Sequence, residues 1–183
     1  MAMTYHISLG SNLGRRPANL AQARLLLEAG GAEVVAASSI YGTEPVDYPG
    51  QPWFLNQVLE IRSELDPPSL LRQARAIEAA LKRIPTVPKG PRTIDIDILF
   101  AGGLVVDTPD LVIPHPRLHL RNFVLIPLAE IAPDFVHPVL GRTVRELAEA
   151  SLDPARVIRK GPSGRGHGGA RPEGRNRPPR ASK

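Results

Sequence analysis

The chain has 183 residues, 42% of them apolar, which is enough for one domain with a hydrophobic core and too few for two comfortable ones. It contains no cysteine, which excludes disulfides, thiolate metal sites and a cysteine nucleophile. The net charge of +5 comes from residues 159–183, which hold eight of the 23 Lys and Arg residues and one acid, Glu173, so residues 1–158 are slightly acidic.

The first half of the chain alternates strand patterns with one helix pattern. Residues 4–9 predict a strand that ends at the turn GSNLG, and residues 17–29 predict a helix that ends at Gly30. Residues 33–41 predict a second strand, and 43–52, with three prolines and a glycine, predict an irregular loop. A clean alternation over 53–65 predicts a third strand. GSNLG is not the dinucleotide fingerprint, and no P-loop motif occurs.

The second half begins with a predicted helix over 69–83, a loop over 84–91 and a strand over 94–100. Gly102 and Gly103 predict a turn that makes residues 104–107 the hairpin partner of that strand. Residues 113–123 predict an irregular loop, followed by helices near 124–131 and 143–150. Residues 159–183 are rich in Gly, Pro and Arg and predict a disordered basic tail.

This order predicts a single α+β domain over residues 1–158. Its two βαβ-like halves favour a ferredoxin-like plait with a βαββαβ core, an extra hairpin strand and short C-terminal helices. The alternative is a doubly wound Rossmann sheet, which needs more uniformly apolar strands than this chain has. No window approaches the 20 or so apolar residues of a membrane span and the N-terminus lacks a secretory-signal pattern, so we expect a cytoplasmic protein.

Two aspartates interrupt the isoleucines of the predicted strand in KGPRTIDIDILF. Side chains alternate along a strand, so Ile94, Ile96 and Ile98 share one face and Asp95 and Asp97 share the other. Two carboxylates held this close repel unless a cation or a proton lies between them. Oxygen ligands on a rigid strand suit Mg²⁺ that is also bound by substrate phosphates. The alternative is a pair of solvated aspartates on an outer sheet face.

Basic and aromatic side chains lie on either side of this pair in the sequence. The segment PHPRLHLRNF supplies four side chains that can carry positive charge, His115, Arg117, His119 and Arg121. We expect them to bind phosphate, with Arg92, rather than zinc. Phe54, Asn56 and Phe123 could form a slot for a flat ring whose edge the amide reads, although core packing also explains each aromatic residue.

Six segments in order together resemble 6-hydroxymethyl-7,8-dihydropterin pyrophosphokinases. They are SLGSNLG, S-x-I-Y-x-T-x-P, Q-x-W-F-L-N, the helix ending in I-E, G-P-R-T-I-D-I-D-I, and L-x-I-P-H-P-R followed by R-x-F-V-L-x-P-L. The resemblance runs from about residue 4 to residue 138. It implies transfer of pyrophosphate from ATP to the pterin hydroxymethyl group with release of AMP, in folate biosynthesis.

The resemblance also implies roles for individual residues. Two Mg²⁺ ions would be bound by Asp95 and Asp97, which would also be catalytic. Pterin would be bound by Thr43, Pro45, Val46, Phe54, Asn56 and Phe123. Arg83, Arg92, His115 and Arg121 would be catalytic and, with Ile98, would bind ATP, while Glu78 matches an acidic helix residue of unassigned role. Small-molecule substrates and a monomer are expected.

The chain departs from the family pattern between residues 82 and 89. Lys82 replaces a glycine, Pro85 replaces an arginine, and Lys89 stands where an aromatic residue is common. This motivates a second hypothesis, a catalytically weakened pterin- or nucleotide-binding protein. A third is a nucleic-acid-binding module that acts through the basic tail, for which we expect at most weak binding.

Overall fold

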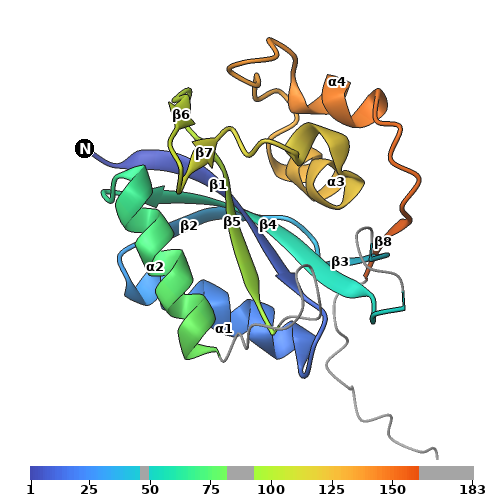
Figure 1. The fold of residues 1–183 in the computed structure, drawn as a ribbon, viewed down its shortest axis with the longest axis horizontal. Coiled ribbons are helices and arrows are strands. Elements are labelled where there is room, and N and C mark those ends of the chain that lie inside the picture. Colours follow the sequence, from blue (N-terminus) through green and yellow to red (C-terminus); the bar gives the residue numbers. More distant parts are fainter. Residues whose placement is uncertain (46–49, 82–92, 161–183) are drawn as a thin grey trace, which may run out of the picture.

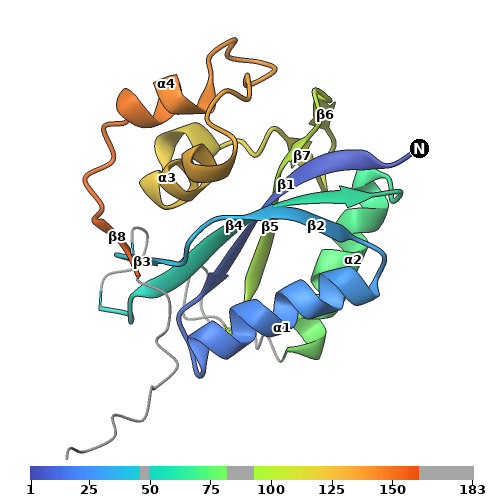
Figure 2. The same ribbon diagram turned by 180° about the vertical axis from the view of Figure 1, so that it is seen from behind.

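The computed structural model describes residues 1–45, 50–81 and 93–160. A six-stranded sheet separates two layers of helices, as Figures 1 and 2 show. Helices α1 (Arg16–Ala29) and α2 (Pro67–Ala80) cover one face, and α3 (Asn122–Ile131) and α4 (Val144–Glu149) lie on the other. The predicted α+β class is therefore confirmed. No helix in the described ranges is long and apolar enough to span a membrane.

The sheet is antiparallel at every pairing between described strands. Its order is β5-β1-β4-β3-β8, and β2 also pairs with β4. The bounds of these strands are β1 Met3–Ser11, β2 Glu33–Ala37, β3 Tyr41–Thr43, β4 Phe54–Ser63, β5 Asp95–Ala101 and β8 Val157–Arg159. A separate two-stranded sheet joins β6 (Val106–Asp107) to β7 (Val112–Ile113).

Alternation along the strands feeds two hydrophobic cores. On β1, Tyr5, Ile7 and Leu9 pack with α1 and α2 in the larger core, together with Leu59 of β4. Val58 of β4 points the other way and packs under α3 and α4. Because helices cover both faces of β1 and β4, these central strands provide a rigid platform for the side chains that they carry.

Two predicted elements differ from the structure. The strand expected over 33–41 is split into β2 and β3, which both pair with β4. The prediction that residues 104–107 pair with the strand over 94–100 is wrong, because Val106 and Asp107 pair with β7. The free edge of β5 is already occupied: the Ile96 N–H donates to Glu78 Oε1 at 2.9 Å, and the Leu99 carbonyl accepts from His115 N–H at 3.0 Å.

Strand β8 and the short 3-10 helix Leu118–Leu120 were not predicted at all. The 3-10 turn lies within the segment predicted as an irregular loop, and β8 crosses the predicted boundary between residues 158 and 159. Residues 161–183 of the predicted tail lie outside the described residues.

Candidate active site

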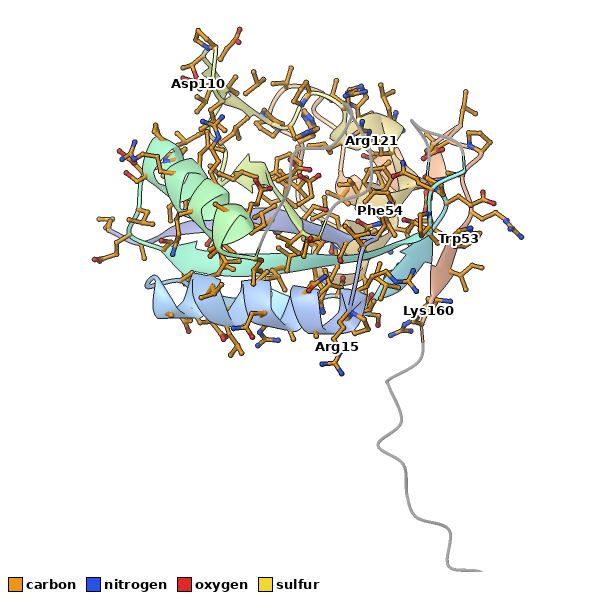
Figure 3. The ribbon with its side chains drawn as sticks, turned by 60° about the horizontal axis from the view of Figure 1, so that its bottom comes forward. Arg15, Trp53, Phe54, Asp110, Arg121 and Lys160 are labelled. Atoms are coloured by element: carbon orange, nitrogen blue, oxygen red, sulfur yellow. The ribbon has the colours of Figure 1, made fainter. Side chains whose placement is uncertain are left out.

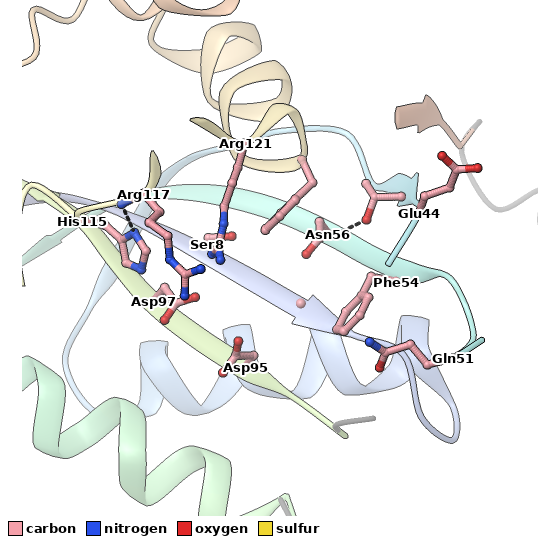
Figure 4. A pocket seen from close by; sticks show the side chains of 13 residues that line it. Ser8, Glu44, Gln51, Phe54, Asn56, Asp95, Asp97, His115, Arg117 and Arg121 are labelled. Atoms are coloured by element: carbon pink, nitrogen blue, oxygen red, sulfur yellow. Dashed lines mark hydrogen bonds between the residues drawn. The ribbon is translucent and has the colours of Figure 1, made fainter. Parts of the chain in front are cut away.

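Strand β5 presents its two aspartates on one face and its isoleucines on the other, as the alternation predicts. Ile94, Ile96 and Ile98 are buried in the larger core. Asp95 and Asp97 are half-buried and line a cleft on the opposite face (Figure 4). Three buried isoleucines on the reverse side hold the strand in place, so the two carboxylates have little freedom to separate.

A β-bulge at Leu99 brings a histidine next to this pair. His6 is paired with Phe100 and Ile7 with Ile98, so Leu99 is an extra residue with no partner on β1. Its carbonyl accepts the His115 N–H, which fixes the segment after β7 alongside β5. His115, 18 residues from Asp97 in the sequence, is thereby held at the edge of β5 and lines the same cleft.

His115 is neutral in this environment rather than the cation that the sequence suggested. Burial, followed by the nearby charges of Arg121 and Arg117, lowers its pKa from 6.5 to about 4, although Asp95 opposes the shift. Its Nδ1 accepts the Arg117 N–H at 3.2 Å, so the ring proton is carried on Nε2. A neutral imidazole with a donor Nε2–H can bind an anionic oxygen without adding charge.

The floor of the cleft is formed by two rows of residues that run across three strands. One row is Asn56 on β4, Gly10 on β1 and Asp95 on β5. The next row places Ser8 between Val58 and Asp97. A side chain at position 10 would bring its Cβ to 2.7 Å from Asn56 Oδ1, so glycine is needed there to leave room for the amide. GSNLG, predicted as a turn, therefore begins inside β1 and forms part of the cleft floor.

The amide of Asn56 is held by a buried hydrogen bond. Its Nδ2 donates to Thr43 Oγ1 at 2.6 Å, and the two residues are 4% and 1% exposed (dashed line in Figure 4). Because the nitrogen is held on the Thr43 side, Oδ1 lies over Gly10 and faces the cleft. Phe54 and Phe123 line the same cleft, and the Arg121 guanidinium lies 5.4 Å from the centre of the Phe123 ring.

Two cavities meet at the aspartate pair. The first, of about 200 Å³, contains the amide and the two phenylalanines, and the second, of about 390 Å³, lies between β5, α2 and the segment around Leu111. Asp95, Asp97 and His115 line both of them. The lining of the first is Ser8, Gly10, Thr43, Glu44, Gln51, Phe54, Asn56, Asp95, Asp97, His115, Arg117, Arg121 and Phe123. Two ligands could therefore approach the same carboxylates from different sides.

Most of the predicted site residues fall in these cavities, and some lie outside the described part of the chain. Ile98 lines the second cavity, and so does Glu78. Pro45 follows the wall residue Glu44 but does not line either cavity. Val46, Arg83 and Arg92 lie outside the described residues, as do Lys82, Pro85 and Lys89.

Several residues of the site escaped the sequence analysis. Ser8, Gly10, Glu44 and Gln51 line the first cavity but were not predicted as site residues. Of the four basic side chains expected to bind phosphate, His115, Arg117 and Arg121 line this cavity, whereas His119 lines neither cavity. The small residues Ser8 and Gly10 could be found only from the pairing of β1 with β4 and β5.

Comparison with known families shows to which of them the chain belongs. The family model described as 7,8-dihydro-6-hydroxymethylpterin-pyrophosphokinase (HPPK) matches residues 6–133. The chain belongs to this family. The prediction of a pyrophosphokinase, a transferase of folate biosynthesis, is confirmed at this level, and a weakened binding protein is not favoured.

Curated relatives agree with the family assignment. A 2-amino-4-hydroxy-6-hydroxymethyldihydropteridine pyrophosphokinase of Methylorubrum extorquens is 47% identical over 155 residues, covering 84% of this chain and 96% of the relative. One of Bacillus subtilis is 47% identical over 127 residues, covering 69% and 76%. Folic acid synthesis protein fol1 of Pneumocystis carinii is 40% identical over 148 residues, or 81% of this chain, which spans only 20% of that protein.

Solved structures support the fold. Plasmodium falciparum HPPK-DHPS wild type with pterin and p-hydroxybenzoate aligns with a TM-score of 0.67 at 19% identity. The match covers 81% of this chain and 43% of that one. At this identity the likeness supports the HPPK fold alone.

Proposed function

We propose that the protein transfers the pyrophosphoryl group of ATP to the hydroxymethyl group of 6-hydroxymethyl-7,8-dihydropterin and releases AMP. The observation that carries this proposal is the meeting of two cavities at Asp95 and Asp97. A two-substrate transfer needs both ligands bound beside one charged centre, with their reacting atoms held together. The names of the curated relatives support the choice of substrates.

The first cavity is the proposed pterin site. Phe54 and Phe123 offer ring faces for a flat heterocycle, and Asn56 offers an amide oxygen fixed by Thr43. Neighbouring strands of a sheet lie about 4.8 Å apart. The backbones at Asn56 on β4 and Asp95 on β5, with Gly10 of β1 between them, are therefore separated by about 10 Å. A bicyclic pterin read at one end by Asn56 can thus point its hydroxymethyl group at the aspartates. Pro45 and Val46 are proposed to contact its edge.

The second cavity is the proposed ATP site. Ile98, Glu78 and His115 line it, and we assign the nucleoside to this side of β5. The triphosphate would extend toward Asp97, where the neutral His115 can donate its Nε2–H and Arg121 can supply positive charge. Arg83 and Arg92 are proposed to contact the phosphates as well.

The donor set fits Mg²⁺. Within the described ranges no group of three or more His, Asp and Glu side chains is arranged to hold a metal ion by itself, so an ion here would be shared between the Asp95 and Asp97 carboxylates and the substrate. Mg²⁺ is commonly held by one or two carboxylates together with substrate phosphates, and we propose two such ions. When bound, they would neutralise phosphate charge and align the transferred group. The remaining work of the protein is to orient both substrates and exclude water.

The other features of the proposal concern the chain as a whole. We interpret β1-α1-β2-β4-α2-β5 as the core of a ferredoxin-like plait, since these four strands run antiparallel in the order β5-β1-β4-β2. We also propose that the protein acts as a monomer in the cytoplasm. Residues 159–183 would bind nucleic acid only weakly, through phosphate contacts.

The proposal is tested by following AMP release from ATP, Mg²⁺ and hydroxymethyldihydropterin. The wild type should release AMP only when the pterin is present. Asp97→Asn should lower kcat by about 10²- to 10³-fold, as expected when one electrostatic contact at a reacting centre is lost. The control is Asp107→Asn, an exposed aspartate on β6, which should leave kcat unchanged. Equal kcat values for wild type and Asp97→Asn would show that Asp97 does not take part in the reaction.

A further inference from the structure

Strand β8 extends the sheet beyond β3, and it lies outside residues 6–133 that match the family. Thr43 is paired with Val157, Gly42 with Ile158 and Tyr41 with Arg159. Main-chain bonds continue this pairing on both sides: Glu44 N–H donates to the Arg156 carbonyl at 3.1 Å, and Lys160 N–H donates to Ile40 at 2.8 Å. The last described segment of the chain is therefore attached along the whole strand that carries Thr43.

Arg156, directly before β8, contacts Glu44, which lines the proposed pterin cavity, and Trp53, which precedes the lining residue Phe54. Its N–H donates to Glu44 Oε2 at 3.0 Å and its Nε donates to Glu44 Oε1 at 2.9 Å. The same guanidinium lies 5.1 Å from the centre of the Trp53 ring. Glu44 directly follows Thr43, and Trp53 directly precedes Phe54 (both labelled in Figure 3), so one arginine joins the two cavity-forming segments.

Arg156 does not itself line either cavity. Its influence on a ligand must therefore pass through Glu44 and Trp53. Glu44 is a cavity-lining residue, and the hydrogen bonds from Arg156, first from its N–H and then from its side chain, lower the pKa of its carboxyl group. The main chain of Trp53 is held from the other side as well, because its carbonyl accepts from Arg16 Nη1 at 2.6 Å.

We propose that Arg156 is a positioning residue for the pterin site. Thr43 is paired with Phe54, and Arg156 joins the next residues of the two strands, Glu44 and Trp53, so it keeps the β3–β4 pair from opening at the end that carries the Phe54 ring and the Glu44 carboxylate. A flat ring binds well only when its stacking face is held in place, so this pre-organisation favours binding. The inference rests on the proposed assignment of the first cavity to the pterin. It adds a role for a segment beyond the family match.

The test compares steady-state kinetics of wild type, Arg156→Ala and Arg159→Ala. Arg159 is the matched control because it lies three residues further along the same segment, at the end of β8, and makes a similar ion pair, but its partners, Glu130 at 3.1 Å and Ser39 at 2.8 Å, do not line the cavities. We expect Arg156→Ala to raise the pterin KM by about 3- to 10-fold, the factor that follows from losing an exposed ion pair and a cation–π contact. The kcat should stay within about two-fold, and the ATP KM should not change. Arg159→Ala should leave the pterin KM unchanged.

Two further variants show whether the effect passes through the proposed contacts. In a Glu44→Ala background, Arg156→Ala should have a smaller effect on pterin KM than it has in the wild type, because one of its two partners is already gone. Arg156→Lys should restore only part of the pterin affinity, since an ammonium group cannot reproduce the two bonds and the ring contact. Full additivity of the Glu44 and Arg156 effects would contradict the inference.

A second readout does not depend on activity. Trp53 is the only tryptophan in the chain, so intrinsic fluorescence reports on its surroundings. Arg156→Ala should change its emission and make it easier to quench with acrylamide, and Arg159→Ala should not. If wild type fails to release AMP with the pterin, the proposed function fails. The inference about Arg156 fails if wild type is active but Arg156→Ala has an unchanged pterin KM. It also fails if Arg156→Ala is less stable, has a lower kcat, and has pterin and ATP KM values that are raised by the same factor.

Discussion

The buried hydrogen bond between Thr43 and Asn56 gives the sharpest test of the proposed pterin site. Thr43→Val keeps the shape of the side chain but removes the oxygen that accepts the Asn56 Nδ2 proton at 2.6 Å. Both residues are nearly inaccessible to solvent, at 1% and 4% exposure, so water cannot easily replace the lost acceptor. Leaving a buried donor without a partner costs about 1–3 kcal/mol.

That cost should appear both in stability and in substrate binding. The free energy of unfolding should fall by about 1–3 kcal/mol, which urea denaturation measures. The Asn56 amide also loses the bond that directs its oxygen over Gly10. A loss of about 1–2 kcal/mol in binding corresponds to a pterin KM raised by about 5- to 30-fold, measured by AMP release at saturating ATP. The ATP KM should stay the same.

The matched control is Thr143→Val, far from the cavities. Thr143 caps α4 by accepting the Glu146 N–H at 3.2 Å, and losing such a cap costs about 1 kcal/mol of stability. This variant should therefore be destabilised with an unchanged pterin KM. If Thr43→Val and Thr143→Val lose stability to a similar degree and neither changes the pterin KM, Asn56 does not read the substrate and the reasoning is refuted.

Two predictions concern the framework of the site. Glu78→Ala removes the acceptor for the Ile96 N–H on the edge of β5 and should lower the free energy of unfolding by about 1–3 kcal/mol, whereas Glu78→Gln, which keeps an acceptor oxygen, should lose less; equal stability of Glu78→Ala and wild type in urea would contradict this role. Burial lowers the pKa of His6 below 6.5 despite Glu60 Oε2 at 3.5 Å from its Nε2, so below pH 6.5 the unfolded chain binds more protons than the folded one. As the pH is lowered from about 6.5, the free energy of unfolding should fall by up to about 1.4 kcal/mol per pH unit until the pKa of His6 in the folded state is reached. His6→Phe should remove this contribution. The check is urea unfolding at pH 7.5 and 5.0, where an undiminished loss in His6→Phe would rule out His6 as the source.

Local patterns predicted the part of the site that lies within one strand. The alternation over 94–98 placed Asp95 and Asp97 on one face and the isoleucines on the other, because a period of two is written directly in the sequence. The helices were predicted to within a few residues at each end, because their periodicity is also visible in the local sequence. These features depend on neighbours along the chain and need no knowledge of the fold.

Features that depend on distant pairing were missed. Strand β8 has three residues and no turn before it, and its partner β3 lies more than 100 residues earlier. The bulge at Leu99 is a mismatch between β1 and β5, and it has no signature in either strand alone. The hairpin expected after Gly103 was wrong because Glu78 and His115 occupy the edge of β5, and only the folded chain brings them there.

The sheet and the connecting segments contribute different parts of the site. Asn56 and Asp95 are separated by one strand whose residue between them is Gly10, so their spacing is set by the sheet itself and varies little. The cationic and donor groups come from the segment after β7, which is fixed to β5 through the Leu99 carbonyl. In the proposed complex, the rigid floor would hold the reacting end of the pterin in register with the aspartates, while groups on the connecting segment would contact the phosphates. This division explains why two charges stand in a strand of isoleucines: burying one face of β5 holds the carboxylates of its other face at a fixed distance from Asn56.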